Sequence, residues 1–229
     1  MKIHNTALLL SGLLMVVAVP LIAEGGSSID KVEDAIEIIN TFSATSDDGI
    51  PSSLLSDARG IAIIPGVIKV GFIIGGNYGK GILSIKDRSG HWTNPAFITM
   101  TGGSIGWQIG AQSSDIILVF NTQRSIDNIT AGKFTLGGDA SVAAGPVGRG
   151  ATANTDIEMN AEIYSYSRTR GLFAGVSIQG CAIEIDYDGI FDFYGNPRIG
   201  AKDIFEDSSI KAPDIASDFK RVLMTQAQP

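Results

Sequence analysis

Apolar residues recur at helical spacing near both ends of the chain. Between Ser28 and Phe42 the apolar positions are Ile29, Val32, Ile36, Ile39 and Phe42. Steps of three and four residues predict an amphipathic helix, with Ser28 as its cap, that packs on the rest of the protein. Asp214–Thr225, which follows Pro213, predicts a terminal helix in the same way.

Two shorter helices are predicted between these ends. Ser52 or Ser53 is expected to cap the first, which ends near Gly60. The second covers Thr122–Ala131, with Thr122 as its cap and Gly132 as its stop.

The region Gly60–Gly195 is rich in short apolar runs separated by turn residues. Pro65-Gly66 and Gly75–Gly79 are expected to end strands, and Asp188-Gly189 is expected to form a two-residue hairpin turn, with Phe191 and Phe193 alternating beyond it. The predicted strands are Ile61–Ile64, Val67–Ile74, Gly81–Lys86, Phe97–Met100, Ile105–Gly110, Asp115–Phe120, Thr155–Ser167, Leu172–Ile178 and Ala182–Tyr187.

Many short strands with close turns, and helices at both ends, predict an α+β fold. Its sheet is curved and mainly antiparallel, either open or barrel-like. The 28 glycines in 229 residues support curvature, because glycine inside a strand is tolerated where the chain bends, bulges or approaches another backbone. No linker divides the chain, so residues 24–229 are predicted to form a single domain with its sheet at about 60–195.

The first residues have the pattern of a secretory signal. Lys2 and His4 precede the apolar stretch Thr6–Ile22, and polarity rises after Ala23. We therefore expect residues 1–23 to be a signal peptide and the protein to be exported, either periplasmic or secreted and peripheral to a membrane. An uncleaved anchor is the alternative, although the stretch is short for a full membrane span.

Charge and cysteine content narrow the function. The formal net charge is −7, and loss of Lys2 with the signal would make it more negative, so bulk charge argues against nucleic acid as a partner. Any site for an anion must then be a local basic patch.

Cys181 is the only cysteine and lies in an apolar run, which predicts a buried thiol; an intermolecular bridge or a reactive thiol is the alternative.

Three enzyme-like patterns lack their partners. Gly102–Gly106 fits G-x-S-x-G around Ser104, but no histidine follows it. Gly148–Ala153 fits G-x-G-x-x-A but precedes a strand-like segment, and Gly79-Lys80 is not followed by Ser or Thr. With one histidine and one cysteine after the signal, the sequence predicts no metal site, no cofactor and no enzyme. A hydrolase that uses an unrecognised carboxylate pair is the remaining catalytic alternative.

Several long stretches resemble one protein family. They are SLLSDARGIAIIPG at Ser53–Gly66, HWTNPAFITMTGGS at His91–Ser104, GGSIGWQIGAQSSD at Gly102–Asp115, GGDASVAAGPVGRG at Gly137–Gly150 and YSRTRGLFAGVSIQG at Tyr166–Gly180. In this order they are similar to the SYLF domain, from Ile29 to the C-terminus, and the signal resembles the exported bacterial branch. The resemblance implies binding to acidic lipids such as phosphoinositides or phosphatidic acid and, in eukaryotic relatives, to actin filaments.

Basic residues beside glycines are the candidate contacts for a lipid headgroup, because guanidinium groups and exposed amides suit phosphate. They are Arg149, Arg168, Arg170, Lys133 and Arg124. Leu172 and Phe173 are the candidate contacts for acyl chains. The alternative is that the basic residues are solvated surface charges or partners of Asp139 and Glu158.

The first helix departs from the family pattern. Eukaryotic members carry basic residues there, whereas this helix has Asp30, Glu33, Asp34 and Glu37 against Lys31. Anionic headgroups should repel that face, so we expect the helix to pack on the sheet instead. The main hypothesis is a non-catalytic module of the cell envelope that binds anionic phospholipids. The alternative is an envelope scaffold, or a protein that binds actin or another filament.

Overall fold

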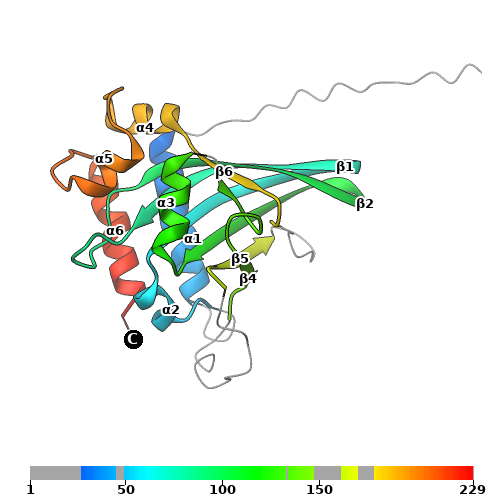
Figure 1. The fold of residues 1–229 in the computed structure, drawn as a ribbon, viewed down its shortest axis with the longest axis horizontal. Helices are drawn as coiled ribbons and strands as arrows, with labels where there is room; N and C mark the ends of the chain where they lie inside the picture. Colours follow the sequence, from blue (N-terminus) through cyan, green and yellow to red (C-terminus); the bar gives the residue numbers. More distant parts are fainter. Residues whose placement is uncertain (1–26, 45–48, 133, 147–160, 170–177, 229) are drawn as a thin grey trace, which may run out of the picture.

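A computed structural model gives the positions of residues 27–44, 49–132, 134–146, 161–169 and 178–228. One sheet packs with helices (Figure 1), so the α+β prediction is confirmed. The helices are α1 (Ser28–Ala44), α2 (Ser52–Asp57), α3 (Gln123–Ala131), α4 (Tyr187–Tyr194), α5 (Ala201–Glu206) and α6 (Asp214–Gln226). The strands are β1 (Gly60–Ile85), β2 (Ala96–Phe120), β3 (Phe134–Thr135), β4 (Val142–Ala144), β5 (Ile163–Thr169) and β6 (Ala182–Ile185).

Helix α1 begins at Ser28, and its capping residue is Ser27 rather than the expected Ser28. The Ser27 hydroxyl accepts a hydrogen bond from Asp30 N–H, and the Asp30 carboxylate accepts one from Ser27 N–H. Ser28 is instead buried against α4, where its hydroxyl donates to the Gly189 carbonyl oxygen. The apolar side of α1, including Val32, packs against β1 and α6, as the spacing predicts. The short helix α2 also differs: it begins after Pro51 and lacks a side-chain cap.

Strands β1 and β2 form one long antiparallel ribbon, with a register that runs from Gly60 opposite Phe120 to Leu83 opposite Ala96. The predicted strand ends at Pro65-Gly66 and Gly75–Gly79 are therefore wrong. Pro65-Gly66 forms a bulge in which Gly66, with φ of 55°, donates its N–H to Asp115 Oδ1 at 2.9 Å. A Pro-Gly pair, which is typical of a turn, therefore bends a continuous strand here.

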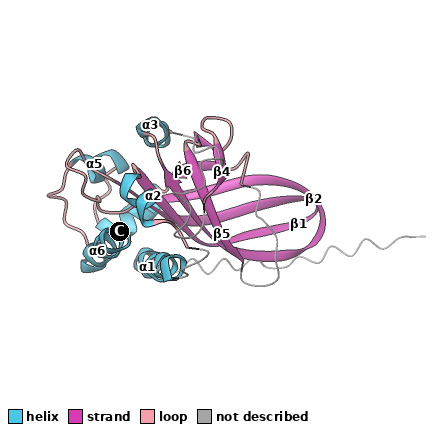
Figure 2. Cartoon of the chain, turned by 90° about the horizontal axis from the view of Figure 1, so that it is seen from below, coloured by secondary structure: helices cyan, strands magenta, loops and turns pink. Residues whose placement is uncertain are grey.

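The ribbon curls back on itself (Figure 2), so that the two halves of β1 face each other. A Cβ added at Gly79 would lie 2.8 Å from Val67 Cγ2, and one at Gly81 would lie 2.8 Å from Ile64 Cα. At the ends of the ribbon, Lys86 N–H donates to the Arg59 carbonyl oxygen at 2.9 Å. The glycines are therefore needed because one half of the strand approaches the backbone of the other.

The remaining strands extend the sheet from β2. Its N-terminal half pairs with β6 and its C-terminal half with β5, and both pairings are antiparallel. β3 adds to β6, while β4 adds to β5 in the parallel direction. Among the described residues these strands form one curved, mainly antiparallel sheet, as expected (Figure 2).

The Asp188-Gly189 dipeptide does not form the predicted hairpin turn. It lies in the first turns of α4, whose cap Asp186 accepts a hydrogen bond from Gly189 N–H at 3.1 Å. Ile190 and Phe193 are buried and Phe191 is exposed, which is the three-residue spacing of a helix rather than the alternation of a strand. Tertiary packing decides the outcome, because Gly189 lies directly against Phe97 of β2.

Three further local predictions are confirmed, whereas the predicted strand Leu172–Ile178 and the first part of Thr155–Ser167 lie outside the described residues. α3 is capped by Thr122 and stopped by Gly132, and α6 follows Pro213. Cys181 is fully buried, beside Gly102 and the Asn77 side chain.

Candidate functional site

Two of the predicted headgroup contacts lie among the described residues. Arg168 is exposed near the end of β5, opposite the buried Asp115 of β2, and Arg124 is exposed on α3. The other predicted contacts, which lie outside the described residues, are Arg149, Arg170, Lys133, Leu172 and Phe173.

The fold does not bring Arg124 and Arg168 together. β5 runs antiparallel to β2, so the partner of Arg168 lies five residues before Phe120, at the opposite end of the pairing from α3. At about 3.3 Å per residue, Arg168 therefore lies roughly 17 Å along the strand from the Phe120 end of the pairing, after which α3 begins. The two side chains cannot share one phosphate group, and the headgroup site stays a prediction.

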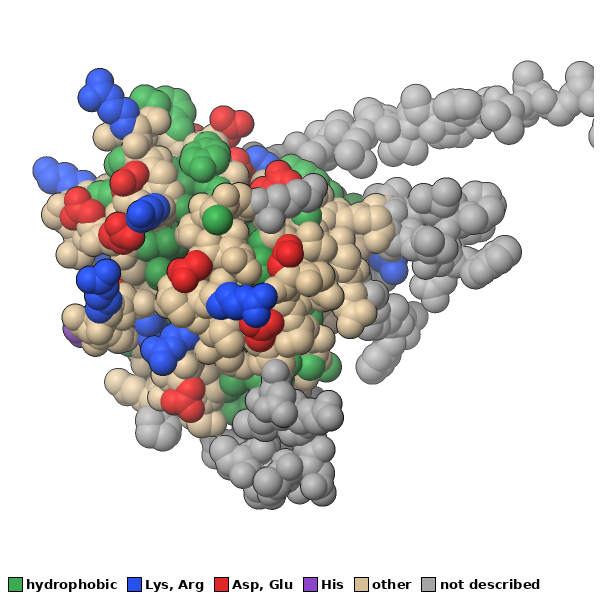
Figure 3. Space-filling model, viewed as in Figure 1, with side chains coloured by type: hydrophobic (Ala, Val, Ile, Leu, Met, Phe, Trp, Pro, Cys, Tyr) green, Lys and Arg blue, Asp and Glu red, His purple; other side chains and the backbone are tan. Residues whose placement is uncertain are grey.

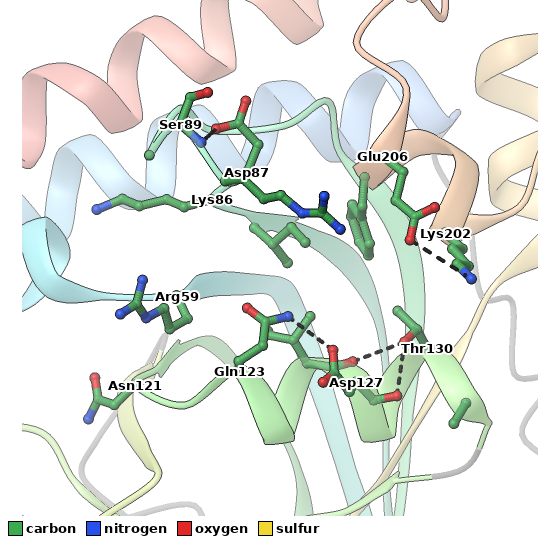
Figure 4. Close-up of a pocket in the computed structure, with 16 residues that line it drawn as sticks. Arg59, Lys86, Asp87, Ser89, Asn121, Gln123, Asp127, Thr130, Lys202 and Glu206 are labelled. Atoms are coloured by element: carbon green, nitrogen blue, oxygen red, sulfur yellow. Dashed lines mark hydrogen bonds and ion pairs between the residues drawn. The ribbon is translucent and has the colours of Figure 1, made fainter.

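A different group of basic residues lines a groove where the two ends of the β1–β2 ribbon meet (Figure 4). The groove has a volume of about 1620 Å³ and lies between the turn that follows β1, helix α3 and helix α5. Its basic residues are Arg59, Lys86, Arg88 and Lys202. Arg59 and Lys86 flank the two ends of β1, and their backbones meet in the hydrogen bond that closes the ribbon.

Lys86 is held in place by the protein. Its ammonium group donates to the carbonyl oxygens of Leu55, at 3.0 Å, and Ser56 at the end of α2, and lies 5.0 Å from the ring centre of Trp92. Burial lowers the pKa of Lys86. The Asp57 carboxylate partly offsets this shift, whereas the Arg59 guanidinium lowers the pKa further. Lys86 therefore mainly joins β1 to α2, although it also lines the groove.

Arg59 and Arg88 are the cations with free donors. Both are exposed, and no other described residue forms an ion pair or hydrogen bond with either guanidinium. Lys202, in contrast, pairs with Glu206 at 3.9 Å. Two unpaired guanidinium groups beside a groove suit a carboxylate or phosphate group of a partner, because each presents a planar fork of N–H donors.

Acidic and amide side chains complete the groove. Asp87 accepts hydrogen bonds from Ser89 N–H and His91 N–H and so fixes the turn that carries Arg88. Asp127 accepts from Gln123 on the first turns of α3 (Figure 4). The lining carries four basic side chains against the three carboxylates of Asp87, Asp127 and Glu206, so the groove is only weakly positive.

The surroundings of Ser104 differ from those of a catalytic serine. Ser104 lies within β2 opposite Gly75, whereas a nucleophile elbow requires a turn from strand to helix. No group of three or more His, Cys, Asp or Glu side chains in this part of the chain could hold a metal ion. The helices that the structure describes also include none long and apolar enough to cross a membrane.

Sequence reasoning missed the groove. The turn Asp87–Gly90 is visible in the sequence, but Arg59 stands far from it along the chain. Only the curled ribbon brings the two together. The signal that could have indicated it is the repeated glycine spacing at Gly79 and Gly81, which permits the halves of β1 to approach.

Comparisons with known proteins agree with the resemblance found in the sequence. A family model described as "Ysc84: Las17-binding protein actin regulator" matches residues 101–226, from the first quarter of β2 to the end of α6. "LAS seventeen-binding protein 3" of Saccharomyces cerevisiae is 36% identical over 184 residues, 79% of this chain and 39% of that protein. "SH3 domain-containing YSC84-like protein 1" of Homo sapiens is 36% identical over 161 residues, 67% of this chain and 47% of that protein.

Proposed function

We propose that the chain, which belongs to the Ysc84 family of Las17-binding actin regulators, is a non-catalytic interaction module. In this proposal the module binds actin filaments. The single observation behind the proposal is the family match, which covers most of β2, the strands that follow it and helices α3 to α6. The chain spans about 39–47% of the length of the two relatives described above, so the proposal concerns this domain and not the activity of those whole proteins.

The groove supplies a contact surface for this function. Arg59 and Arg88 project unpaired guanidinium groups from rigid positions, one at the start of β1 and the other in a turn fixed by Asp87. Charged groups held on rigid elements accelerate encounter with a surface of opposite charge and fix its orientation. We therefore place the filament contact at the groove, with acidic side chains of the partner reaching these two residues.

The test is co-sedimentation with actin filaments at low and high salt. The double variant Arg59→Gln/Arg88→Gln should weaken binding about tenfold, because two exposed charged contacts contribute up to about 1 kcal/mol each. Arg198→Gln/Lys211→Gln is the matched control, since it removes the same charge from exposed positions outside the groove. Equal binding by both double variants, or no sedimentation of the unaltered protein with filaments at any salt, would refute the proposal.

Anionic phospholipid headgroups are the second candidate ligand. The observation in their favour is the same pair of unpaired guanidinium groups, whose forks also match phosphate oxygens. Vesicles of neutral lipid with and without phosphatidic acid or a phosphoinositide separate this candidate from the first. Sedimentation with the anionic vesicles but not with filaments would favour it, and Arg168→Gln would show whether the predicted β5 contact takes part.

A cell-envelope location belongs to this second proposal and rests on the apolar segment Thr6–Ile22. Fractionation of cells that express the full chain, together with N-terminal sequencing of the product, tests it. An uncut product in the cytoplasmic fraction would exclude it.

A further inference from the structure

Large apolar side chains are exposed around helix α4, beside the start of α5. The large hydrophobic residues exposed in the described part of the chain are Ile29, Tyr78, Tyr187, Phe191 and Met224. All but Met224 lie around the junction of α4 with the start of α1 and with β1. We call Ile29, Tyr78, Tyr187 and Phe191 the aromatic end.

Contacts between elements place these side chains beside one another. Tyr187 and Phe191 are one helical turn apart on α4 and are 65% and 52% exposed. Ser28, next to Ile29, donates its hydroxyl to Gly189 O at 3.1 Å, which joins the start of α1 to the middle of α4. Ile29 is thereby brought beside α4.

Strand β1 reaches the same place. Lys80 Nζ lies 2.7 Å from the Asp186 carboxylate at the start of α4. Tyr78 is two residues from Lys80 and so lies on the same face of β1. Figure 3 shows hydrophobic side chains over α4, with both acidic and basic side chains around them. Exposed apolar side chains gathered in this way mark an interaction surface rather than scattered surface residues.

The rim of the aromatic end is acidic. Asp30 and Glu33 on α1, and Asp188 and Asp192 on α4, are exposed, and Lys31 of α1 is a basic residue near Asp192. α4 itself carries no basic residue, and Lys80 is committed to Asp186, whose hydrogen bond raises the pKa of Lys80. A bilayer with anionic lipids would be repelled by these carboxylates, whereas a cationic partner would be attracted.

From this combination we propose that the aromatic end is a second interaction surface, which binds a basic segment of a partner protein. Apolar side chains of that segment pack on Tyr187 and Phe191, and its Lys or Arg residues face Glu33 and Asp188. The charge of this surface is opposite to that of the groove, so the two surfaces select different partners. The inference does not depend on actin or lipid binding at the groove.

The test is fluorescence anisotropy with a labelled synthetic peptide, an amphipathic helix of Leu and Lys, and a matched peptide of Leu and Glu. The full chain should bind the Lys peptide and not the Glu peptide. Tyr187→Ala/Phe191→Ala should weaken binding about tenfold or more, as loss of two central aromatic contacts does. Glu33→Gln/Asp188→Asn should weaken binding less and should reduce its dependence on salt.

The control for lost apolar surface is Met224→Ala, at an exposed position on α6 outside the aromatic end. It should bind like the unaltered protein, as should Arg59→Gln/Arg88→Gln. Thermal unfolding checks that each variant is folded. The inference is overturned if the Glu peptide binds as tightly, or if Met224→Ala and Tyr187→Ala/Phe191→Ala lose affinity equally. Self-association or binding to neutral vesicles that is lost in Tyr187→Ala/Phe191→Ala would also overturn it, in favour of a second copy or a membrane.

Discussion

Replacing Gly81 by alanine tests the curled ribbon on which the groove depends. A Cβ at this position would lie 2.8 Å from Ile64 Cα and 2.9 Å from Ile64 Cγ1, and would also meet the Ile63 carbonyl oxygen. Ordinary carbon contacts are 3.5–4.0 Å, so the facing backbone must shift. Because backbone atoms are involved, the cost of overpacking lies in the upper part of the usual range, at about 2–3 kcal/mol. The up to about 1 kcal/mol that alanine gains over glycine within a strand leaves a net loss of about 1–2 kcal/mol.

The assay is thermal and urea unfolding of Gly81→Ala beside Gly103→Ala. Gly103 pairs with Gly76 in the same ribbon, but a Cβ added there meets no other atom within 4 Å. We expect Gly81→Ala to lower the melting temperature by about 2–8 °C, at roughly 2–4 °C per kcal/mol for a chain of this size, and Gly103→Ala to leave it unchanged or raise it slightly. If the two variants melt together, the halves of β1 do not approach as described, and the groove loses its structural basis.

Two further predictions concern single polar contacts. The buried Tyr166 hydroxyl donates to the Pro146 carbonyl oxygen at 2.9 Å, so Tyr166→Phe should lower the free energy of unfolding by about 1–2 kcal/mol, as measured by urea titration; an unchanged midpoint would contradict this contact. The Ser28 hydroxyl, which lies beside the Asp192 carboxylate, and the Ser28 N–H, which donates to it at 3.0 Å, lower the pKa of Asp192 below its ordinary value of 3.8. The contact therefore contributes its full stabilisation above pH 3.8, and this stabilisation is lost as the pH falls through the lower pKa of the folded state. In Asp192→Asn the free energy of unfolding should accordingly fall less steeply below about pH 4. Equal slopes for both proteins in acid unfolding would count against it.

The elements predicted correctly from the sequence are those whose signals are local. Thr122 and Gly132 bound α3 through contacts within a few residues, and the apolar spacing of α1 and α6 is set by the period of the helix itself. The cap of α1 was misplaced by one residue because Ser27 and Ser28 offer the same hydroxyl. Only the packing of Ser28 against α4 distinguishes them.

The wrong predictions share a different cause, which is contact between distant segments. Gly75–Gly79 has turn composition, but β2 pairs with it throughout and holds it extended. Asp188-Gly189 has the composition of a hairpin turn, but Asp186 caps a helix there and Phe97 fills the space beside Gly189. In both cases the local preference for a turn is overridden by pairing or packing that the order of residues does not reveal.

The net charge of the chain does not describe the charge of its separate surfaces. A net charge of −7 describes the field far from the protein, but salt screens exposed charges beyond about 8–10 Å. Within that distance a partner at the groove meets Arg59 and Arg88, whereas a partner at the aromatic end meets Asp188 and Glu33. On the two proposals above, these opposite local fields select an acidic partner at the groove and a basic partner at the aromatic end. Raising the salt concentration should weaken both contacts, while each set of neutralised variants should weaken only its own.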